Sequence, residues 1–247
     1  MKKNKLRLRD WLLSIALGLA IAGVAGFFYV KHYQSEQAIA VNQSTRQRIQ
    51  KDSKAKVKKE KVLNQYRLYG LTDSEINAAK TLPVSAIGDS IMLGSSAYLK
   101  VLFPEMSIDA EVGRQVQAAP AIISQLKSSG KLANTVVISL GTNGPMTEAD
   151  INGILDQLGT ERQVFWVTAY APGKAWIDPV NKLIHAAAKT HANLHVVDWY
   201  YLAGGNDDWF ADDGVHPNDA GRPHYYTLIA KDVMQTLKSN SEKTIIT

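Results

Sequence analysis

The most regular pattern in the chain is an alternation, after residue 80, of short apolar runs with segments of helical spacing. The apolar runs are rich in β-branched residues and cover positions 83–88, 107–112, 135–141, 163–170 and 194–200. The segments with apolar residues every three or four positions lie at 118–126, 151–158, 180–187 and about 225–237. Strands that alternate with helices of this length predict βαβ units, and continuously apolar strands predict helices on both faces. The pattern therefore indicates an α/β domain built on a parallel sheet.

A different hydrophobic pattern precedes this domain. Residues 11–30, "WLLSIALGLAIAGVAGFFYV", contain no charged side chain. A helix of about 20 apolar residues can cross the ~30 Å hydrocarbon core of a bilayer, and aromatic residues stand at both ends of the run, as they do at membrane interfaces. Five Lys and Arg residues precede the run and three follow it within the next 20 positions. This bias predicts a cytoplasmic N-terminus and an extracytoplasmic remainder.

The alternative interpretation of this run is a cleaved signal peptide, with "AIA" at positions 38–40 as the cleavage site. The apolar core of a signal peptide has about 7–15 residues. The greater length of this run therefore favours an uncleaved anchor. Both interpretations place the rest of the chain outside the cytoplasm.

Charge divides the chain in a similar way. Residues 1–79 hold 15 Lys and Arg against 6 Asp and Glu, whereas residues 80–247 hold 13 against 17. The net charge of +5 therefore belongs to the N-terminal third, and we expect no nucleic-acid binding by the globular part. We divide the chain into a cytoplasmic basic segment, a transmembrane helix, a basic stalk, a globular domain and a tail, at 1–10, 11–30, 31–81, 82–240 and 241–247.

The stalk is polar and strongly basic, with eight Lys and Arg residues over positions 46–61. Such a run predicts a solvated spacer, and a second interpretation is attraction to anionic lipid heads or anionic wall polymers. Towards its end, "TDSE" at 72–75 has the spacing of a capping box, in which Thr72 caps a helix and Glu75 reaches back. We therefore expect a short helix just before the globular domain.

The composition excludes several kinds of chemistry. The chain has no cysteine, which rules out disulfides, a thiolate nucleophile and cysteine-based metal sites. It also has no clustered metal-ligand spacing and no glycine-rich loop of the kind that binds phosphate. We therefore expect neither a metal nor a cofactor.

Polar and glycine-containing motifs follow the predicted strands. They are "GDS" at 88–90, "GRQ" at 113–115, "GTNG" at 141–144 and, in the loop before the last helix, "DGVHP" at 213–217. In open parallel sheets, ligands bind beyond the carboxyl ends of the strands. We therefore expect these four motifs to meet at one edge of the sheet.

Together the motifs contain the groups needed for acyl transfer through a serine. Ser90 lies at a strand-to-helix turn, and a serine becomes nucleophilic when a histidine held by a carboxylate removes its proton. In a tight turn, Asp213 can accept from Nδ1 of His216 while Nε2 faces Ser90. We predict these three as the catalytic residues. The candidate oxyanion donors are the backbone N–H groups of Ser90 and Gly113 and the side-chain amide of Asn143.

Other residues near these motifs have two interpretations each. Arg114 could bind a substrate carboxylate or form an ion pair with Glu111. Trp176 could stack on a sugar or pack in the core. His224 is an alternative base, but no carboxylate stands three residues before it. We keep Arg114 and Trp176 as tentative substrate-binding residues.

On these motifs the chain resembles the SGNH (GDSL-type) hydrolase superfamily, over about residues 82–237. The matching residues are Ser90, Gly113, Asn143, His216 and Asp213. The resemblance implies a flavodoxin-like three-layer α/β/α fold with a five-stranded parallel sheet, a Ser-His-Asp triad and an oxyanion hole from the serine, glycine and asparagine. "AIGDSIML", "ISLGTNG" and "DWFADDGVHP" are most similar to the extracytoplasmic SGNH domain of cell-wall O-acetyltransferases.

This resemblance implies a serine enzyme that acts on acyl esters of cell-wall glycan. Such acetyltransferases usually carry a multi-span membrane domain ahead of the SGNH domain, whereas here we predict one span. The expected partners are an acyl ester donor and either glycan or water as acceptor, with a separate multi-span membrane acyltransferase as one source of acyl groups. The alternatives are a lysophospholipase or thioesterase, with Met92, Leu93 and Trp176 lining an acyl groove, and a non-catalytic glycan-binding module. A complete triad argues against the last.

Overall fold

The computed structural model describes residues 58–246, with the side chains of residues 58–242. One parallel sheet has the order β2-β1-β3-β4-β5. Its strands are β1 (Val84–Gly88), β2 (Met106–Ala110), β3 (Thr135–Ser139), β4 (Gln163–Val167) and β5 (Leu194–Val197). The order reverses between β1 and β3, which is where open α/β sheets bind their ligands. The prediction of an α/β fold with five parallel strands is confirmed.

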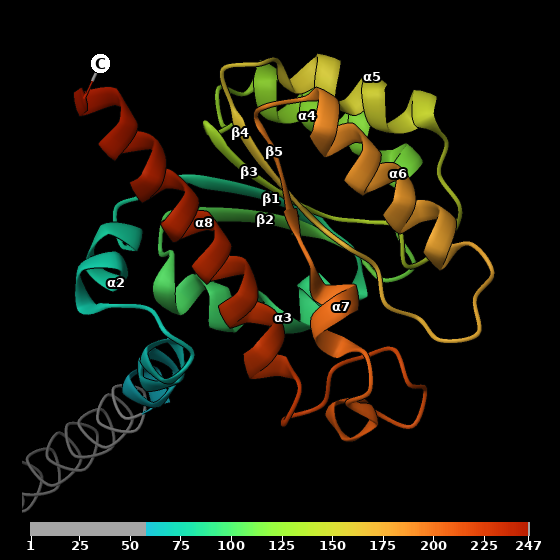
Figure 1. Ribbon diagram of the computed structural model, residues 1–247, viewed down its shortest axis with the longest axis horizontal. Coiled ribbons are helices and arrows are strands. Elements are labelled where there is room, and N and C mark those ends of the chain that lie inside the picture. The colour runs from blue at the N-terminus through green and yellow to red at the C-terminus, as the bar shows by residue number, and fades with distance from the viewer. Residues whose placement is uncertain (1–57, 247) are drawn as a thin grey trace, which may run out of the picture. The chain divides into compact units, whose positions relative to one another are not determined.

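Helices cover both faces of this sheet (Figure 1). On one side lie α2 (Asp73–Ala79), α3 (Ser90–Leu102), α7 (Trp199–Ala203) and α8 (Arg222–Ile246). On the other lie α4 (Ala119–Ser128), α5 (Glu148–Leu158) and α6 (Ile177–Thr190). Two short 3₁₀ turns, η1 (Val116–Ala118) and η2 (Asp207–Trp209), belong to the loops beyond β2 and β5. Every residue of β1 and β3 is buried, as continuously apolar central strands require.

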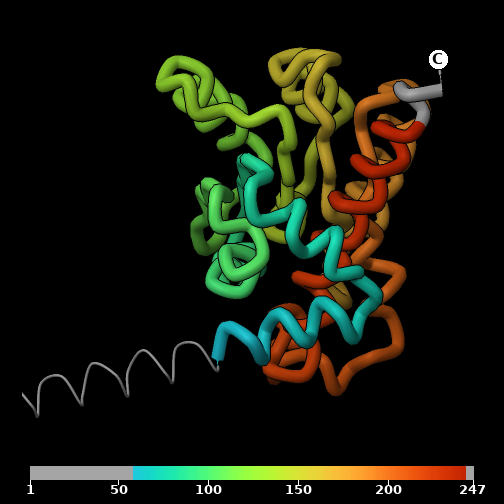
Figure 2. The backbone as a smooth tube through the Cα atoms, turned by 90° about the vertical axis from the view of Figure 1, so that its left-hand side faces the viewer, coloured from blue at the N-terminus to red at the C-terminus, as the bar shows by residue number. Residues whose placement is uncertain are grey.

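Part of the segment expected as a stalk packs against the sheet domain. Residues 58–68 are helical (Figure 2). Val62, Leu63 and Tyr66 of this helix are buried in the core on the α3/α8 side. Tyr66 donates a hydrogen bond from its hydroxyl to the Tyr98 carbonyl at 3.1 Å. The compact unit therefore begins near Lys59, well before the expected boundary at residue 82. The charge run hid these apolar positions, which recur at the spacing of one helix face.

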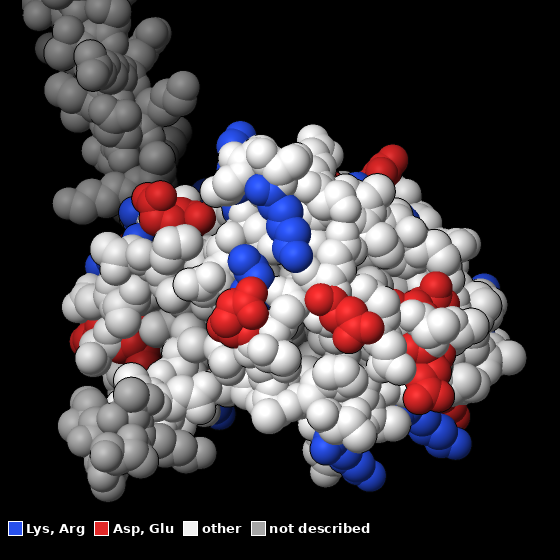
Figure 3. Space-filling model, turned by 90° about the horizontal axis from the view of Figure 1, so that it is seen from above, with Lys and Arg blue, Asp and Glu red and all other residues white. Residues whose placement is uncertain are grey.

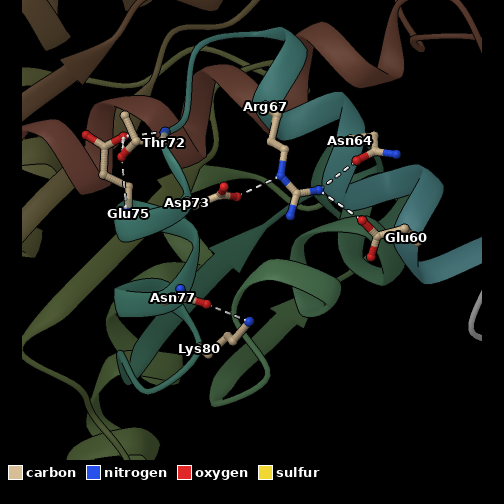
Figure 4. A network of polar contacts seen from close by, with 8 residues as sticks. All are labelled: Glu60, Asn64, Arg67, Thr72, Asp73, Glu75, Asn77 and Lys80. Carbon is tan, nitrogen blue, oxygen red and sulfur yellow. Dashed lines mark hydrogen bonds and ion pairs between the residues drawn. The ribbon is translucent and has the colours of Figure 1, made fainter.

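Polar contacts fasten this N-terminal helix to α2 (Figure 4). Arg67 donates to Asp73 at 2.8 Å and to Glu60 at 3.0 Å, so that one guanidinium joins the two helical segments. The expected capping box is present, with Thr72 accepting from the backbone of Glu75 and Glu75 accepting from the backbone of Thr72. The exposed ion pairs contribute little energy each, so the buried apolar side chains are the main anchor of this segment.

Two element ends differ from the sequence-based expectation. The last strand stops at Val197 rather than residue 200, because Asp198 caps α7 by accepting a hydrogen bond from the backbone N–H of Tyr201. The last helix runs from Arg222 to Ile246, so the segment expected as a tail from residue 241 continues α8.

The predicted membrane span at 11–30 and most of the stalk lie outside the described residues. None of the helices within 58–246 combines the length and hydropathy that crossing a bilayer requires. On the face of the domain seen in Figure 3, acidic and basic side chains are scattered among uncharged ones. That face therefore offers no broad basic surface of the kind that binds nucleic acid.

Candidate active site

Ser90 is the first residue of α3 and stands just beyond the end of β1. Between the two elements, Asp89 caps the helix, because its Oδ1 accepts a hydrogen bond from the backbone N–H of Ile91 at 3.0 Å. The first N–H groups of a helix lack partners inside the helix and give that end partial positive charge. The N–H of Ser90 is one of them. The nucleophile candidate therefore stands beside a donor suited to a developing oxyanion.

The loop before α8 brings His216 and Asp213 to Ser90. Nε2 of His216 lies 2.8 Å from Oγ of Ser90, and Nδ1 lies 2.6 Å from Oδ2 of Asp213. Oδ1 of Asp213 accepts from the backbone N–H groups of His216 at 3.0 Å and Val215 at 2.9 Å. These two backbone donors, and then the His216 ring, lower the pKa of Asp213 to about 2. An ionised Asp213 therefore holds the ring with Nε2 towards Ser90.

Backbone contacts hold this loop in shape. Phe210 and Pro217 form an antiparallel bridge across its base. The side chain of Asn218 donates to the carbonyls of Asp208 and Phe210, each at 2.8 Å. Gly214, with φ of 67°, takes the left-handed conformation that other residues rarely adopt. The spacing of Asp213 and His216 is thus fixed by a braced turn.

The predicted oxyanion donors Gly113 and Asn143 follow β2 and β3, the two strands that flank β1. Gly113 follows β2 with φ of 74°, and within residues 58–246 its backbone N–H has no hydrogen-bond acceptor. Asn143 follows β3, and its Nδ2 donates to Oδ2 of Asp89 at 3.3 Å and to the carbonyl of Arg114 at 3.2 Å. Both bonds are long, and catalytic hydrogen bonds commonly tighten only when substrate binds. The oxyanion role of these donors stays a prediction.

Asp89 belongs to this site although the sequence reasoning did not single it out. Its side chain is fully buried, and its two oxygens accept from Ile91 and from Asn143. Burial raises the pKa of Asp89, while the N–H of Ile91 and other donors act in the opposite direction. Asp89 thus joins the cap of the Ser90 helix to the Asn143 amide. Its place before the serine, at a strand-to-helix turn, is the signal that identifies it.

Arg114 directly follows Gly113, and only 9% of its side chain is exposed. Its guanidinium donates to the carbonyls of Gly88 at 3.3 Å and Asp109 at 2.7 Å. It also forms ion pairs with the Asp109 carboxylate at 2.7 Å and with Glu111 at 3.2 Å. The ion pair with Glu111 is therefore present, and these contacts favour a role in holding the loop that carries Gly113. Substrate binding by Arg114 stays untested.

Trp176, at the start of α6, is partly buried against the core of the α4–α6 side. Its Nε1 donates to the carbonyl of Thr142, next to Asn143, at 3.2 Å. Nζ of Lys174 lies 5.8 Å from the centre of its ring. Trp176 thus packs against the core, as one of its two interpretations expects, and its hydrogen bond supports the loop of Asn143.

His224, the alternative base, is engaged elsewhere. Its ring stacks on Trp209 with 3.6 Å between ring centres, and its Nε2 lies 3.1 Å from the Tyr69 hydroxyl. Burial lowers the pKa of His224. In the part of the chain that the structure describes, no group of three or more His, Asp or Glu side chains could hold a metal ion.

Comparison with known proteins gives two kinds of relative, although no family model matches the chain. The O-acetyltransferase OatA of Staphylococcus aureus is 36% identical over 171 residues, which are 69% of this chain and 28% of that protein. The peptidoglycan O-acetyltransferase OatA of Listeria monocytogenes is 40% identical over 144 residues, or 58% of this chain and 23% of that protein. The expected resemblance to cell-wall O-acetyltransferases is confirmed. The chain spans less than a third of the length of these relatives.

Solved structures share the fold. The C-terminal catalytic domain of Streptococcus pneumoniae peptidoglycan O-acetyltransferase A matches with a TM-score of 0.56 and 24% identity, over 65% of this chain and 95% of that domain. A family 3 carbohydrate esterase of Clostridium thermocellum matches with a TM-score of 0.52 and 18% identity, over 64% of this chain and 98% of its own. These two solved structures share the fold of this domain, and the likeness in sequence is to O-acetyltransferases.

Proposed function

We propose that this domain is a serine acyl-ester enzyme of the SGNH type, acting as an O-acetyltransferase on cell-wall glycan. The observation that carries the proposal is the hydrogen-bonded chain from Ser90 through His216 to Asp213 at the end of β1. The likeness to peptidoglycan O-acetyltransferases supports acetyl as the group transferred and peptidoglycan as the acceptor.

In the first half-reaction, Oγ of Ser90 attacks the carbonyl carbon of an acetyl ester while Nε2 of His216 takes the hydroxyl proton. The negative charge that develops on the carbonyl oxygen is met by the N–H groups of Ser90 and Gly113, with the Asn143 amide as a third donor. Collapse of this intermediate expels the donor alcohol, which receives the proton from His216. Acetyl-Ser90 remains.

In the second half-reaction, a sugar hydroxyl gives its proton to His216 and attacks acetyl-Ser90, which restores the free serine. Water can take the place of the sugar, and the result is then hydrolysis. The side chains of His216 and Asp213 are 46% and 49% exposed, so solvent reaches the base. Binding of the acceptor must therefore compete with water, and it decides between transferase and esterase.

The lysophospholipase alternative fits the described residues less well. Met92 is fully buried and therefore cannot line an open acyl groove, and Trp176 is held by Thr142. Only Leu93, of the three expected apolar residues, presents a largely exposed side chain, at 43%. A long acyl chain would thus find little apolar surface from these residues beside Ser90.

We propose further that residues 11–30 anchor the enzyme in the cell membrane with the domain on the outer side. The five Lys and Arg residues before this run, against three after it, support that orientation. A separate multi-span membrane acyltransferase as the source of acyl groups stays a prediction.

The test is a transfer assay with the full-length chain in detergent. The chain is incubated with an aryl acetate and an oligomer of β-1,4-linked N-acetylglucosamine, and mass spectrometry follows acetate on sugar. We expect acetylated oligomer with the wild type and none with Ser90→Ala. Release of free acetate alone would instead assign an esterase, and an active Ser90→Ala chain would overturn the proposal.

A further inference from the structure

A cavity of about 540 Å³ lies beyond the ends of β4 and β5, and none of the three predicted catalytic residues lines it. Its walls are the loop between β4 and α6 and the end of α7, which Figure 1 shows at the end of the sheet where these strands stop. The lining side chains that matter here are Tyr170, Lys174, Asp178, Tyr200 and Tyr201. We call this the β4/β5 cavity. Its volume is in the range of sites that bind small molecules.

Two chains of contacts connect the β4/β5 cavity to the catalytic residues. On one wall, the ring of Tyr170 stacks on Phe210 with 4.8 Å between centres, and Phe210 pairs with Pro217, the neighbour of His216. On the other side, Trp176 of the same loop donates to the carbonyl before Asn143. The segments that line the cavity thus contact both the loop that carries His216 and the loop that carries Asn143.

The order of the strands places the cavity where a polymeric acceptor bound at the triad can reach it. Gly113, Ser90 and Asn143 follow β2, β1 and β3, and the cavity follows β4 and β5, so all lie along one edge. The hydroxyl that accepts the acetyl group must reach Nε2 of His216. When one sugar of a glycan stands there, the next sugars have to extend along this edge, and the cavity is the hollow that they meet on the β4/β5 side.

The lining has the chemistry that recognises a sugar ring. Tyr201 is 84% exposed and Tyr200 is 39% exposed, so two aromatic rings face solvent at the cavity. The Tyr200 hydroxyl donates to Oδ1 of Asp178 at 2.8 Å, which fixes this ring and leaves Oδ2 free of that bond. Aromatic faces suit the apolar C–H face of a pyranose, while Asp178 and Lys174 offer an acceptor and a donor for its polar groups.

We propose that the β4/β5 cavity binds an N-acetylhexosamine ring of the acceptor glycan, next to the ring that receives the acetyl group. This inference rests on the proposed function and deepens it. Tyr201 supplies the stacking surface, and Lys174 donates to a hydroxyl or to the N-acetyl carbonyl. Occupancy of the cavity holds the acceptor hydroxyl at His216 long enough to compete with water.

The experiment compares Tyr201→Ala and Tyr201→Phe in the full-length chain, with Leu68→Ala as a matched control. Leu68 is 74% exposed and is not among the residues that line the cavity. The measured quantity is the ratio of acetyl transfer to hydrolysis at one sub-saturating concentration of peptide-free N-acetylglucosamine oligomers of one to five rings. We expect Tyr201→Ala to lower this ratio about tenfold for the longer oligomers, the size of one lost aromatic contact. Tyr201→Phe and Leu68→Ala should keep the ratio.

A general loss of folding lowers transfer and hydrolysis together and leaves the ratio unchanged, so the ratio isolates acceptor binding. Lys174→Ala provides a second variant, for which we expect a smaller fall in the same direction. A wild-type ratio for Tyr201→Ala at every oligomer length would overturn the inference. The same assay is repeated with peptidoglycan fragments that carry stem peptides. A fall seen only with these fragments would also overturn the inference, because the cavity would then recognise peptide.

Direct binding separates this inference from the proposed function. The longest oligomer is titrated onto Ser90→Ala and onto Ser90→Ala with Tyr201→Ala, and NMR or calorimetry gives the Kd. Binding that weakens about tenfold in the double variant supports the cavity even if the wild type transfers no acetate. Equal binding by the two variants, or none by Ser90→Ala, contradicts the cavity even if transfer occurs.

Discussion

Replacement of Asp89 by asparagine tests how the nucleophile and the oxyanion donors are held together. The carboxylate accepts two hydrogen bonds, at Oδ1 from the Ile91 N–H at 3.0 Å and at Oδ2 from Nδ2 of Asn143 at 3.3 Å. An amide of the same shape has one acceptor oxygen and one NH₂ donor. In either orientation, one donor therefore faces another donor. The cap is the shorter bond, so we expect the new amide to keep it. Asn143 then loses this acceptor and keeps only the carbonyl of Arg114.

The size of the effect follows from these contacts. Removal of an oxyanion donor typically lowers kcat by about 10²–10³, and Asp89→Asn displaces such a donor without removing it. We therefore expect kcat to fall by no more than in Asn143→Ala. Because the cap survives, the loss of stability should stay below the ~1 kcal/mol typical of a lost N-cap.

The pH dependence of stability has a definite sign at this residue. Burial raises the pKa of Asp89 in the folded state above its ordinary value of 3.8. The folded chain therefore holds this proton more tightly than the unfolded chain, and the wild type loses stability as pH rises from about 3.8 through the raised pKa. Asp89→Asn carries no such proton. The difference in unfolding free energy between the two chains should shift in favour of the variant over this range.

The decisive assay is a double-mutant cycle on the rate of Ser90 acetylation by an aryl acetate. If Asp89 acts through Asn143, the chain with both substitutions should be no slower than Asn143→Ala alone. Losses that multiply would show that Asp89 acts by another route. A wild-type rate for Asp89→Asn would refute the reasoning altogether.

Three further predictions concern the loop, the turn and the N-terminal helix. Asp213→Asn should lower kcat by roughly 10³–10⁴, because an amide no longer fixes the His216 tautomer, and steady-state kinetics measures this. Since the pKa of Asp213 falls from 3.8 to about 2 on folding, its contribution to stability is present above pH 4 and is lost as pH falls towards 2. The difference in thermal unfolding temperature between wild type and Asp213→Asn should therefore shrink over that range. A constant difference would contradict this. Gly88→Ala should lower the free energy of unfolding by about 1–3 kcal/mol, because the new methyl group meets the Met92 side chain. Gly94→Ala meets nothing within 4 Å and should raise it by about 0.5–1 kcal/mol. Denaturant unfolding compares the two variants, and equal changes would show that the contact with Met92 is relieved. Tyr66→Ala should lower the free energy of unfolding by about 3–5 kcal/mol in the same measurement, as for other buried aromatic residues. A change under 1 kcal/mol would show that the N-terminal helix is not packed against the core.

The sheet could be predicted because each of its strands has a recognisable pattern in its own local sequence. The apolar runs around Val84, Thr135 and Val164 are buried on both faces, and their short length and β-branched residues favour strands covered by helices. The end of β5 was harder, because Trp199 and Tyr200 have strong strand propensity, yet Asp198 caps a helix there. A single capping bond outweighed the propensity of two residues.

The site was predictable to the level of residue types in order along the chain. That Ser90 meets His216, 126 residues later, follows from the way parallel strands gather their carboxyl ends at one edge. The role of Asp89 was hidden because its second hydrogen bond, to Asn143, depends on the side-by-side placement of β1 and β3. The β4/β5 cavity could not be foreseen, since Tyr170 lies in the loop after β4 and Tyr201 lies in α7.

The central claim is that Ser90 carries the acetyl group. The most direct measurement is the intact mass of the full-length chain, quenched with acid within seconds of mixing with an aryl acetate, followed by peptide mapping. We expect one added acetyl group, located on Ser90, in the wild type. In a chain with His216→Ala the same group should appear much more slowly. An acetyl group on another residue, or turnover with no acylated chain at any time, would contradict it.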